Sequence, residues 1–439
     1  MGREVLSEGT SLTPTSVSKC SSAINDLLKN WFEHIPEEII HSILVRLPIE
    51  SLVRCTSICK SWRAIIKHPR FMLIHLTHTQ KSNDQNDTHL MLLNTMFNQE
   101  TVTYTLHFDN QCFDQYCKVE LPIGLKEIMV NDNYRVVGTC NGLICLADDL
   151  GRYDSNFVLW NPFVRKYVIL PKPSVRLSTH GEYDACIGMG YDARNNDYKV
   201  VRVVTLLHQG GAFEDFRTLA QVYSLTKGTW GKLLSDLPPC FMNGRCFGQV
   251  FYGEAQPDNI LQVATMVQAF VNGAVHLLVV RQMGNDFAYY VLTFDLSSEA
   301  FGEIMLPKRF IFQDTPEKTL ELKLSVTGDE KSIGLFVWFR IGADAFLDIW
   351  AMKEYGVEKS WTKLIILTPQ GPNRSSYQAL CFRKSGEVVL LVQDSSEVFA
   401  LDLVNKQFKC LGVSRGWCFK AYSYEESLVL LDRLDTVSY

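Results

Sequence analysis

The chain has 439 residues, of which 46% are hydrophobic and 21% charged, which is ordinary for a soluble globular protein of two or three domains. Its net charge of −5 argues against binding nucleic acid along the whole chain, because phosphate contacts need clustered Lys and Arg. The 13 cysteines are odd in number and none forms a Cys-x-x-Cys pair. We therefore expect free cysteines in a reducing compartment, without disulfides or a metal site.

Residues 1–33 are polar, weakly patterned and without an apolar core. We expect a disordered tail here and not a signal peptide. No run of about 20 apolar residues occurs in the chain, so no membrane-spanning helix is predicted. The expected location is the cytoplasm, the nucleus or both.

Residues 34–78 are predicted to form three short helices. The first carries an apolar stripe at helical spacing, made of Ile35, Ile39, Ile40, Ile43, Leu44 and Leu47. Pro36 suits the first turn of this helix, and Pro48 ends it. The apolar residues of the second and third helices are Leu52, Val53, Ile58, Trp62, Ile65 and Ile66.

About forty residues are too few for an independent core, and these apolar side chains outnumber what three short helices can hide. Some of them are expected to face a partner protein or the next domain; a helical cap packed wholly on that domain is the alternative. Six basic and three acidic residues give this segment a local charge of +3. Such a patch suits an acidic protein partner better than DNA, unless it is only a solvated helix surface.

The polar run at 79–89 is predicted to be a linker or loop and to mark the domain boundary. Residues 90–439 consist mainly of short β-patterned runs separated by turns. A loose repeat runs through them, in which a strand ends on an aromatic residue or Leu and a polar turn leads to the next strand. Its anchors are Trp160, Tyr223, Phe294, Trp350 and Leu401.

The anchors lie about 60 residues apart on average, slightly more than the period of about 50 in a kelch-type propeller blade. Each hairpin buries little by itself, so such units must stack around an axis. We therefore predict a large all-β domain over residues 90–439, a kelch-like β-propeller of about six blades. Pairing of Ser427–Leu431 with Leu90–Leu93 would close the ring. An irregular β-sandwich is the alternative, because the spacing is uneven.

The helical segment also carries a recognisable combination of residues. Its members are Ile35-Pro36, Glu38, Ile39-Ile40, Ile43-Leu44, Leu47-Pro48, Leu52, Ile58-Cys59-Lys60 and Trp62. This combination resembles the F-box, with conservative departures at Ile35, where Leu is usual, and at Ile58, where Val is usual. Cys55-Thr56 stand where plant members often have Phe-Arg.

Four segments of the β-patterned region add to the resemblance. They are Cys140–Ile144, Trp160-Asn161-Pro162, Gly188–Asp192 with Asp197–Val200, and Ser427-Leu428. They are similar to the F-box-associated domain of plant F-box/kelch-repeat proteins and, more loosely, to S-locus F-box proteins. The resemblance implies a non-catalytic substrate receptor of an SCF-type cullin–RING ubiquitin ligase. Its F-box docks a small acidic adaptor that leads to cullin and the RING subunit, and its β domain holds a target protein for ubiquitination.

The resemblance also implies which residues meet the adaptor. They are Ile35, Pro36, Ile39, Ile43, Leu44, Leu47, Pro48, Leu52, Ile58, Cys59, Lys60 and Trp62. Internal packing of the helices is the alternative for these positions, above all for Trp62. Lys60 and Arg63 would pair with acids of the adaptor or face solvent. No target-binding residue is predicted; the irregular loops 171–186, 207–218 and 308–320 are the candidate segments.

Other conspicuous groups are predicted to be structural. Asn141-Gly142 is a hairpin-turn signal, residues 192–197 are expected to form a turn and not a cation site, and His75 and His78 to be packing or surface histidines. The aromatics expected in the blade cores are Trp160, Tyr223, Trp230, Trp350 and Trp361.

No nucleotide-binding, nucleophile or zinc-protease motif is present in the sequence. We therefore expect no enzymatic activity, no cofactor and no metal. A kelch-fold enzyme would need a metal or nucleophile cluster that the scattered histidines and cysteines do not supply. The remaining alternative is a stand-alone propeller that binds a protein or a carbohydrate without a ligase role.

Overall fold

The computed structural model describes residues 35–86, 88–97, 101–128, 134–148, 156–206, 216–242, 269–284, 286–313, 320–341, 344–369, 376–392, 397–413 and 417–439. Its contacts divide the chain into two units, Met1–His78 and Thr79–Tyr439. The tail predicted at 1–33 lies outside the described residues.

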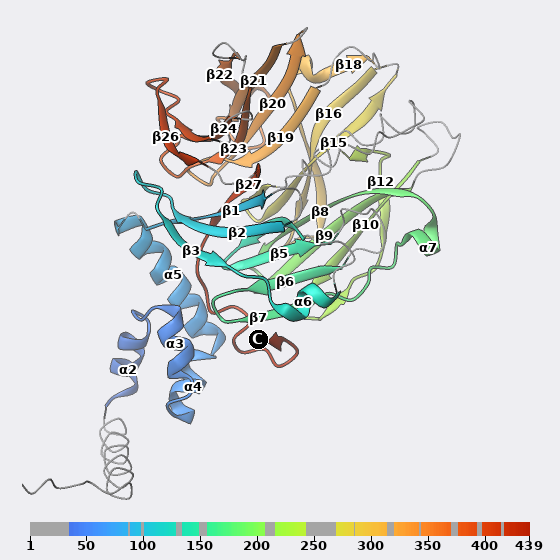
Figure 1. The fold of residues 1–439 in the computed structure, drawn as a ribbon. Coiled ribbons are helices and arrows are strands. Elements are labelled where there is room, and N and C mark those ends of the chain that lie inside the picture. Colours follow the sequence, from blue (N-terminus) through green and yellow to red (C-terminus); the bar gives the residue numbers. More distant parts are fainter. Residues whose placement is uncertain are drawn as a thin grey trace, which may run out of the picture. The chain divides into compact units, whose positions relative to one another are not determined.

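The described chain begins with four helices (Figure 1): α2 (Glu37–Leu44), α3 (Ile49–Cys55), α4 (Lys60–Ile66) and α5 (Pro69–Asn86). Pro36 and Pro48 stand at the N-caps of α2 and α3, where their fixed φ suits the entry to a helix. At the start of α4, the Cys59 sulfur accepts a hydrogen bond from the Trp62 backbone N–H at 3.4 Å. The buried apolar residues of these helices are Ile40, Leu44, Ile49, Leu52, Ile66, Phe71 and Leu76.

Helix α5 is an addition to the three predicted helices, and it continues to residue 86. The prediction of a linker or loop is therefore wrong for residues 79–86. The polar run contains no Gly or Pro that would end a helix. It also has partners that a local pattern does not show, since the Gln80 amide donates to the Glu425 carboxylate at 2.5 Å.

The unit Thr79–Tyr439 is a β-propeller whose six blades are antiparallel sheets (Figure 1). Blade 1 contains β1 (Leu90–Phe97), β2 (Thr101–Phe108), β3 (Gln115–Val119) and β27 (Trp417–Tyr424). Blade 2 contains β4 (Arg135–Cys140), β5 (Leu143–Ala147), β6 (Phe157–Asn161), β7 (Lys166–Ile169) and β28 (Val437–Ser438). Blade 3 contains β8 (Tyr183–Asp192), β9 (Asp197–Leu206), β10 (Arg217–Ser224), β11 (Thr229–Trp230) and β12 (Leu234–Leu237).

Blade 4 contains β13 (Phe241–Met242), β14 (Ala269–Val271), β15 (Ala274–Met283), β16 (Asp286–Asp295), β17 (Ala300–Met305) and β18 (Ile311–Gln313). Blade 5 contains β19 (Leu320–Val326), β20 (Ile333–Ile341), β21 (Asp344–Met352) and β22 (Trp361–Leu367). Blade 6 contains β23 (Tyr377–Phe382), β24 (Val388–Val392), β25 (Glu397–Leu401) and β26 (Phe408–Val413). The loops hold the short helices α6 (Ile123–Ile128), α7 (Leu177–His180), η3 (Lys308–Phe310) and η4 (Glu358–Ser360).

The innermost strands form a closed ring, in which β27, β4, β8, β14, β19 and β23 contact one another in turn and β23 contacts β27. The ring closes in blade 1, where β27 pairs with β1 over Leu90–Met96. The predicted closure by Ser427–Leu431 is therefore wrong. That segment is instead held against blade 2, where the Asn161 amide donates to the backbone oxygens of Ser427 and Val429, both at 2.9 Å.

Four hairpins share one five-residue turn, which accounts for part of the sequence repeat. Its first residue accepts hydrogen bonds from the backbone N–H groups two and three positions further on, a turn that Asn and Asp favour, and its fifth residue has a φ between 50° and 58°. The first residues are Asn161, Asp192, Asp295 and Asp402. Three repeat anchors, Trp160, Phe294 and Leu401, each precede such a turn by one residue.

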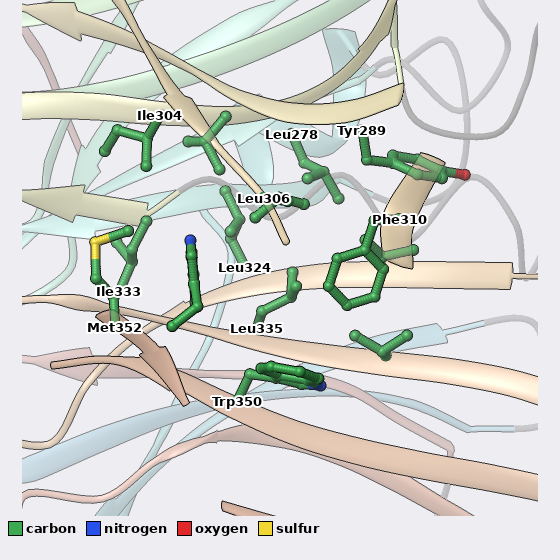
Figure 2. Close-up of a cluster of buried hydrophobic side chains, with 14 of the residues drawn as sticks. Leu278, Tyr289, Ile304, Leu306, Phe310, Leu324, Ile333, Leu335, Trp350 and Met352 are labelled. Atoms are coloured by element: carbon green, nitrogen blue, oxygen red, sulfur yellow. The ribbon is translucent and has the colours of Figure 1, made fainter. Parts of the chain in front are cut away.

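Apolar clusters join neighbouring blades. Figure 2 shows the cluster of blades 4 and 5, in which Leu278, Tyr289, Ile304 and Leu306 lie opposite Leu324, Ile333, Leu335, Trp350 and Met352. Of the aromatics predicted in the blade cores, those that are buried are Trp160, Tyr223, Trp350 and Trp361. The fifth, Trp230, is half-buried. Side-chain burial between the blades thus supplies the stacking that single hairpins lack.

Ten of the cysteines in the described ranges form no disulfide. Within those ranges, no three His, Cys, Asp or Glu side chains are grouped so that they could hold a metal ion. None of the helices that the structure describes is long and apolar enough to cross a membrane.

Candidate interaction surfaces

The twelve residues predicted at an adaptor interface differ widely in exposure. Two are fully buried, Leu44 and Leu52. Four are half-buried, Ile35, Leu47, Cys59 and Trp62. Six are exposed, Pro36, Ile39, Ile43, Pro48, Ile58 and Lys60. The structure thus separates the predicted set into residues that pack and residues that a partner can reach.

Three of the exposed residues are large aliphatics. Ile39 and Ile43 lie four residues apart on α2 with exposed fractions of 51% and 49%, and Ile58, between α3 and α4, is 53% exposed. Residues four apart share one face of a helix, so Ile39 and Ile43 form an apolar ridge on α2, here called the α2 ridge. A scattered exposed aliphatic needs no explanation, but an apolar ridge is a candidate contact for a partner.

Leu44 and Leu52 have a packing role instead. Both have an exposed fraction of 0%, so a partner cannot contact them without opening the fold. The sequence could not separate Leu44 from Ile43, because the first helix is apolar at both positions. Adjacent residues point about 100° apart around a helix, and the tertiary packing decides which of the two is covered.

The structure adds exposed residues that the sequence analysis missed. On α5, Leu73 and Ile74 have exposed fractions of 50% and 37%; they were missed because no fourth helix was predicted, although Pro69 followed by an apolar run could have indicated one. The basic residues Arg46, Arg54 and Arg70 are also exposed. The surface of the helical unit therefore combines aliphatic side chains with positive charge.

The histidine pair of α5 is structural in part. His75 is buried and its Nε2 lies 2.9 Å from the Leu47 backbone oxygen. Burial lowers the pKa of His75. The hydrogen bond to the Leu47 backbone oxygen raises this pKa, and the nearby His78 lowers it, so that the pKa stays below its ordinary value. His78 is exposed. The prediction that these are packing and surface histidines is confirmed.

In the propeller, the Asn-Gly motif holds the C-terminal segment. Asn141 and Gly142 have φ values of 48° and 78°, as a type I′ hairpin turn requires, so the predicted turn is confirmed. The Ser427 hydroxyl donates to the Asn141 backbone oxygen at 2.6 Å, and the Tyr424 hydroxyl donates to that of Gly142 at 3.1 Å. A Cβ at position 142 would lie 2.3 Å from the Ser427 Oγ. Only glycine fits here, and together with Asn161 this motif holds the C-terminal segment against blade 2.

The acidic turn at 192–197 is also structural, as predicted. Asp192 caps its turn and is fully used: its carboxylate accepts from the Ser297 hydroxyl at 2.8 Å and pairs with the Lys199 ammonium at 3.0 Å. Burial would raise the pKa of Asp192, but hydrogen bonds from Asn195, Ser297 and Lys199 outweigh it and hold that pKa well below its usual range. The group ties blade 3 to blade 4.

A cavity of about 320 Å³ lies where β4, β14, β19, β23 and β27 end, at the axis of the propeller. Of the loops predicted to contact a target, 207–215 and 314–319 lie outside the described residues. In the first loop, the backbone oxygens of Pro171 and Val175 are bound by Trp230 and Arg202, while residues 177–182 are intermediate to exposed. No local sequence pattern indicates this cavity, because its walls come from five blades.

The fold defines a class of protein in which a small helical unit precedes a six-bladed β-propeller. Residues 32–72 match the family described as F-box-like, and residues 88–431 match the F-box associated beta propeller domain. Because the second match covers most of the chain, the protein belongs to the F-box-associated β-propeller family. F-box proteins are generally adaptor or receptor subunits.

Relatives in Arabidopsis thaliana support this assignment. The F-box/kelch-repeat protein At3g23880 is 26% identical over 82% of this chain and 85% of its own length. The F-box protein CPR1 is 26% identical over 90% of this chain and 89% of its own. Among solved structures, TolB from Acinetobacter baumannii aligns over 81% of this chain and 72% of its own, with 8% identity and a TM-score of 0.42.

Proposed function

We propose that this protein is the substrate-recognition subunit of an SCF-type cullin–RING ubiquitin ligase. Residues 34–78 bind an acidic adaptor that leads to cullin and the RING subunit, and residues 90–439 hold the target protein. The observation that supports this most is the α2 ridge, where Ile39 and Ile43 stand about half exposed inside the range that matches the F-box. The protein would act in the cytoplasm, the nucleus or both.

The exposed apolar surface is large enough to form the centre of an interface with the adaptor. Full burial of an exposed Ile contributes about 2 kcal/mol, so Ile39, Ile43 and Ile58, each about half exposed, together offer about 3 kcal/mol. Interfaces commonly depend on a few such side chains, surrounded by residues that mainly exclude water. The exposed Arg46 and Arg54 add positive charge to the same helical unit, which favours an acidic adaptor and speeds association.

The proposed mechanism is proximity. A receptor that binds adaptor and target at the same time raises the local concentration of the target near the ubiquitin-loaded enzyme and orients its lysines. In this mechanism, the chain supplies no acid, base or nucleophile. Its contribution is measured as binding at two places and not as turnover.

The test is affinity of the full chain for a purified acidic adaptor, alone and in complex with cullin. Ile39→Asp/Ile43→Asp would bring two charges into the contact, at a cost of several kcal/mol, so binding should weaken at least 100-fold, or about 3 kcal/mol. Ile123→Asp is the matched control, because Ile123 is 76% exposed on the propeller helix α6. It should leave adaptor binding unchanged.

Two results would contradict the proposal. If the wild-type chain binds no acidic adaptor, the stand-alone binding propeller becomes the better account. If the double variant still binds with wild-type affinity, the adaptor does not contact the α2 ridge. Thermal unfolding of each variant separates a lost contact from a lost fold.

A further inference from the structure

The cavity at the propeller axis has features of a binding site. It has a volume of about 320 Å³, and it is lined at the ends of the innermost strands of five blades. All its lining residues belong to the unit Thr79–Tyr439. Sites at which several separate chain segments converge, with apolar walls and a few polar groups, are common ligand positions.

The walls include aromatic rings in fixed positions. The ring of Phe270 lies against Gly190 of the neighbouring blade, where a Cβ would approach it to 2.3 Å. The ring of Phe382 lies against Gly334 in the same way, and a Cβ at position 334 would also approach the ring to 2.3 Å. Both rings line the cavity with the half-buried Val326. The two ring–glycine contacts hold the apolar wall of the cavity in place before any ligand binds.

The charged groups of the cavity are unequally balanced. Asp109 is neutralised by Arg383, with 2.6 Å between carboxylate and guanidinium. The carboxylate of Glu330 lies 3.7 Å from the ammonium of Lys384, the basic residue that lines the cavity. Glu425 has a neutral partner, the Gln80 amide, at 2.5 Å. Of the charged residues that line the cavity, Asp109, Glu330 and Glu425 are acidic and Lys384 is basic. With Arg383 counted against Asp109, one negative charge remains in excess.

Glu425 is the charged group of the cavity that a cationic ligand would neutralise. Burial raises the pKa of Glu425, and the hydrogen bond from Gln80 and the charge of Lys384 offset this only in part. A carboxylate in such a place is stabilised by a cation that brings its own hydrogen-bond donors. The apolar wall beside it suits a long aliphatic stem, and a stem with a cationic head is the side chain of Lys or Arg.

We propose that this axial cavity receives a lysine or arginine side chain from a segment of the target protein, with its head on Glu425 and its stem against Phe270 and Phe382. The inference rests on the proposed function, since it names the place and the chemistry of target recognition. An anionic or phosphorylated segment would instead meet Glu330 and Glu425 opposite a lysine that is already paired. The charge complementarity thus favours a basic occupant.

The test selects peptides from a random dodecapeptide library displayed on phage, using the immobilised full chain. Selected sequences should be enriched in Lys or Arg. For one selected peptide, replacing that Lys by norleucine, or that Arg by citrulline, should weaken binding at least tenfold. Glu425→Gln should weaken it by a similar factor, since Gln can still accept from Gln80 while losing the charge. Raised salt should weaken it as well.

Two further variants keep the result interpretable. Ser423→Lys places a tethered cation at an exposed lining position, 3.4 Å from the Glu330 carboxylate, and should block the peptide without altering Glu425. Glu358→Gln, at an exposed position in η4, should change nothing. Selection without Lys or Arg, or equal binding to Glu425→Gln and Ser423→Lys, would overturn the proposal. Adaptor binding is measured on the same samples: a chain that binds adaptor but no basic peptide refutes the cavity alone, whereas a chain that binds the peptide but no adaptor refutes the ligase role.

Discussion

Asn161 offers a sharp test of how the C-terminal segment is held against blade 2. Its side-chain oxygen accepts from the backbone N–H groups of Phe163 and Val164, as in the other turns of this kind, and its amide donates to the backbone oxygens of Ser427 and Val429. The corresponding positions in two other turns hold Asp295 and Asp402, where no such donor is needed. Asn161→Asp therefore keeps the turn and removes only the clamp on the C-terminal segment.

The size of the stability loss follows from the two backbone carbonyls, those of Ser427 and Val429, that lose their hydrogen-bond donor. Asn161 has an exposed fraction of 0%, and each buried acceptor that loses its donor costs about 1–3 kcal/mol. A carboxylate facing two carbonyl oxygens adds to this cost. We expect Asn161→Asp to lower the free energy of unfolding by at least about 3 kcal/mol, and Asn161→Ala to do the same. Asp402→Ala, which removes turn hydrogen bonds that are exposed to solvent, should have a much smaller effect.

Urea unfolding followed by tryptophan fluorescence measures the loss, and limited proteolysis shows where it acts. The bonds after residue 425 should become the first sites of cleavage in Asn161→Asp, but not in Asp402→Ala. Because a six-bladed unit need not unfold in two states, the shift in midpoint is compared between variants and not as an absolute free energy. An unchanged midpoint with a protected C-terminal segment would refute the clamp.

Three other predictions concern stability. Leu44→Ala should cost about 3 kcal/mol by leaving a cavity in the helical unit; a loss below about 1 kcal/mol in thermal unfolding would mean that the position is not a packed core. Gly142→Ala should cost at least about 2 kcal/mol through backbone strain and collision with Ser427, and a melting temperature equal to that of wild type would contradict this. Burial lowers the pKa of His276 to about 4, so stability should fall as pH drops from 6.5 toward 4, where only the unfolded chain gains the proton, by roughly 3 kcal/mol. His276→Gln should flatten that slope, and an unchanged slope would assign it to other groups.

The sequence was informative where physical chemistry is local. Pro36 and Pro48 place the first two helices, Asn141-Gly142 specifies its hairpin turn, and the anchors before polar turns indicate a repeated β-unit. These features depend on residues within a few positions of one another, through fixed φ, hydrogen bonds within a turn, and periodic apolar spacing. The six blades could be anticipated because a repeated hairpin has few stable ways to bury its faces.

The tertiary structure decided what depends on partners far apart in the chain. It exposes Ile43 and buries its neighbour Leu44, because packing covers only one side of α2. It closes the ring with β27 and leaves Ser427–Leu431 to be held by Asn161, since pairing at closure depends on geometry across the whole unit. It also brings Glu425 and Phe270 to one cavity from separate blades. Local pattern fixes which elements can form, whereas burial and charge at a surface are properties of elements that meet only after folding.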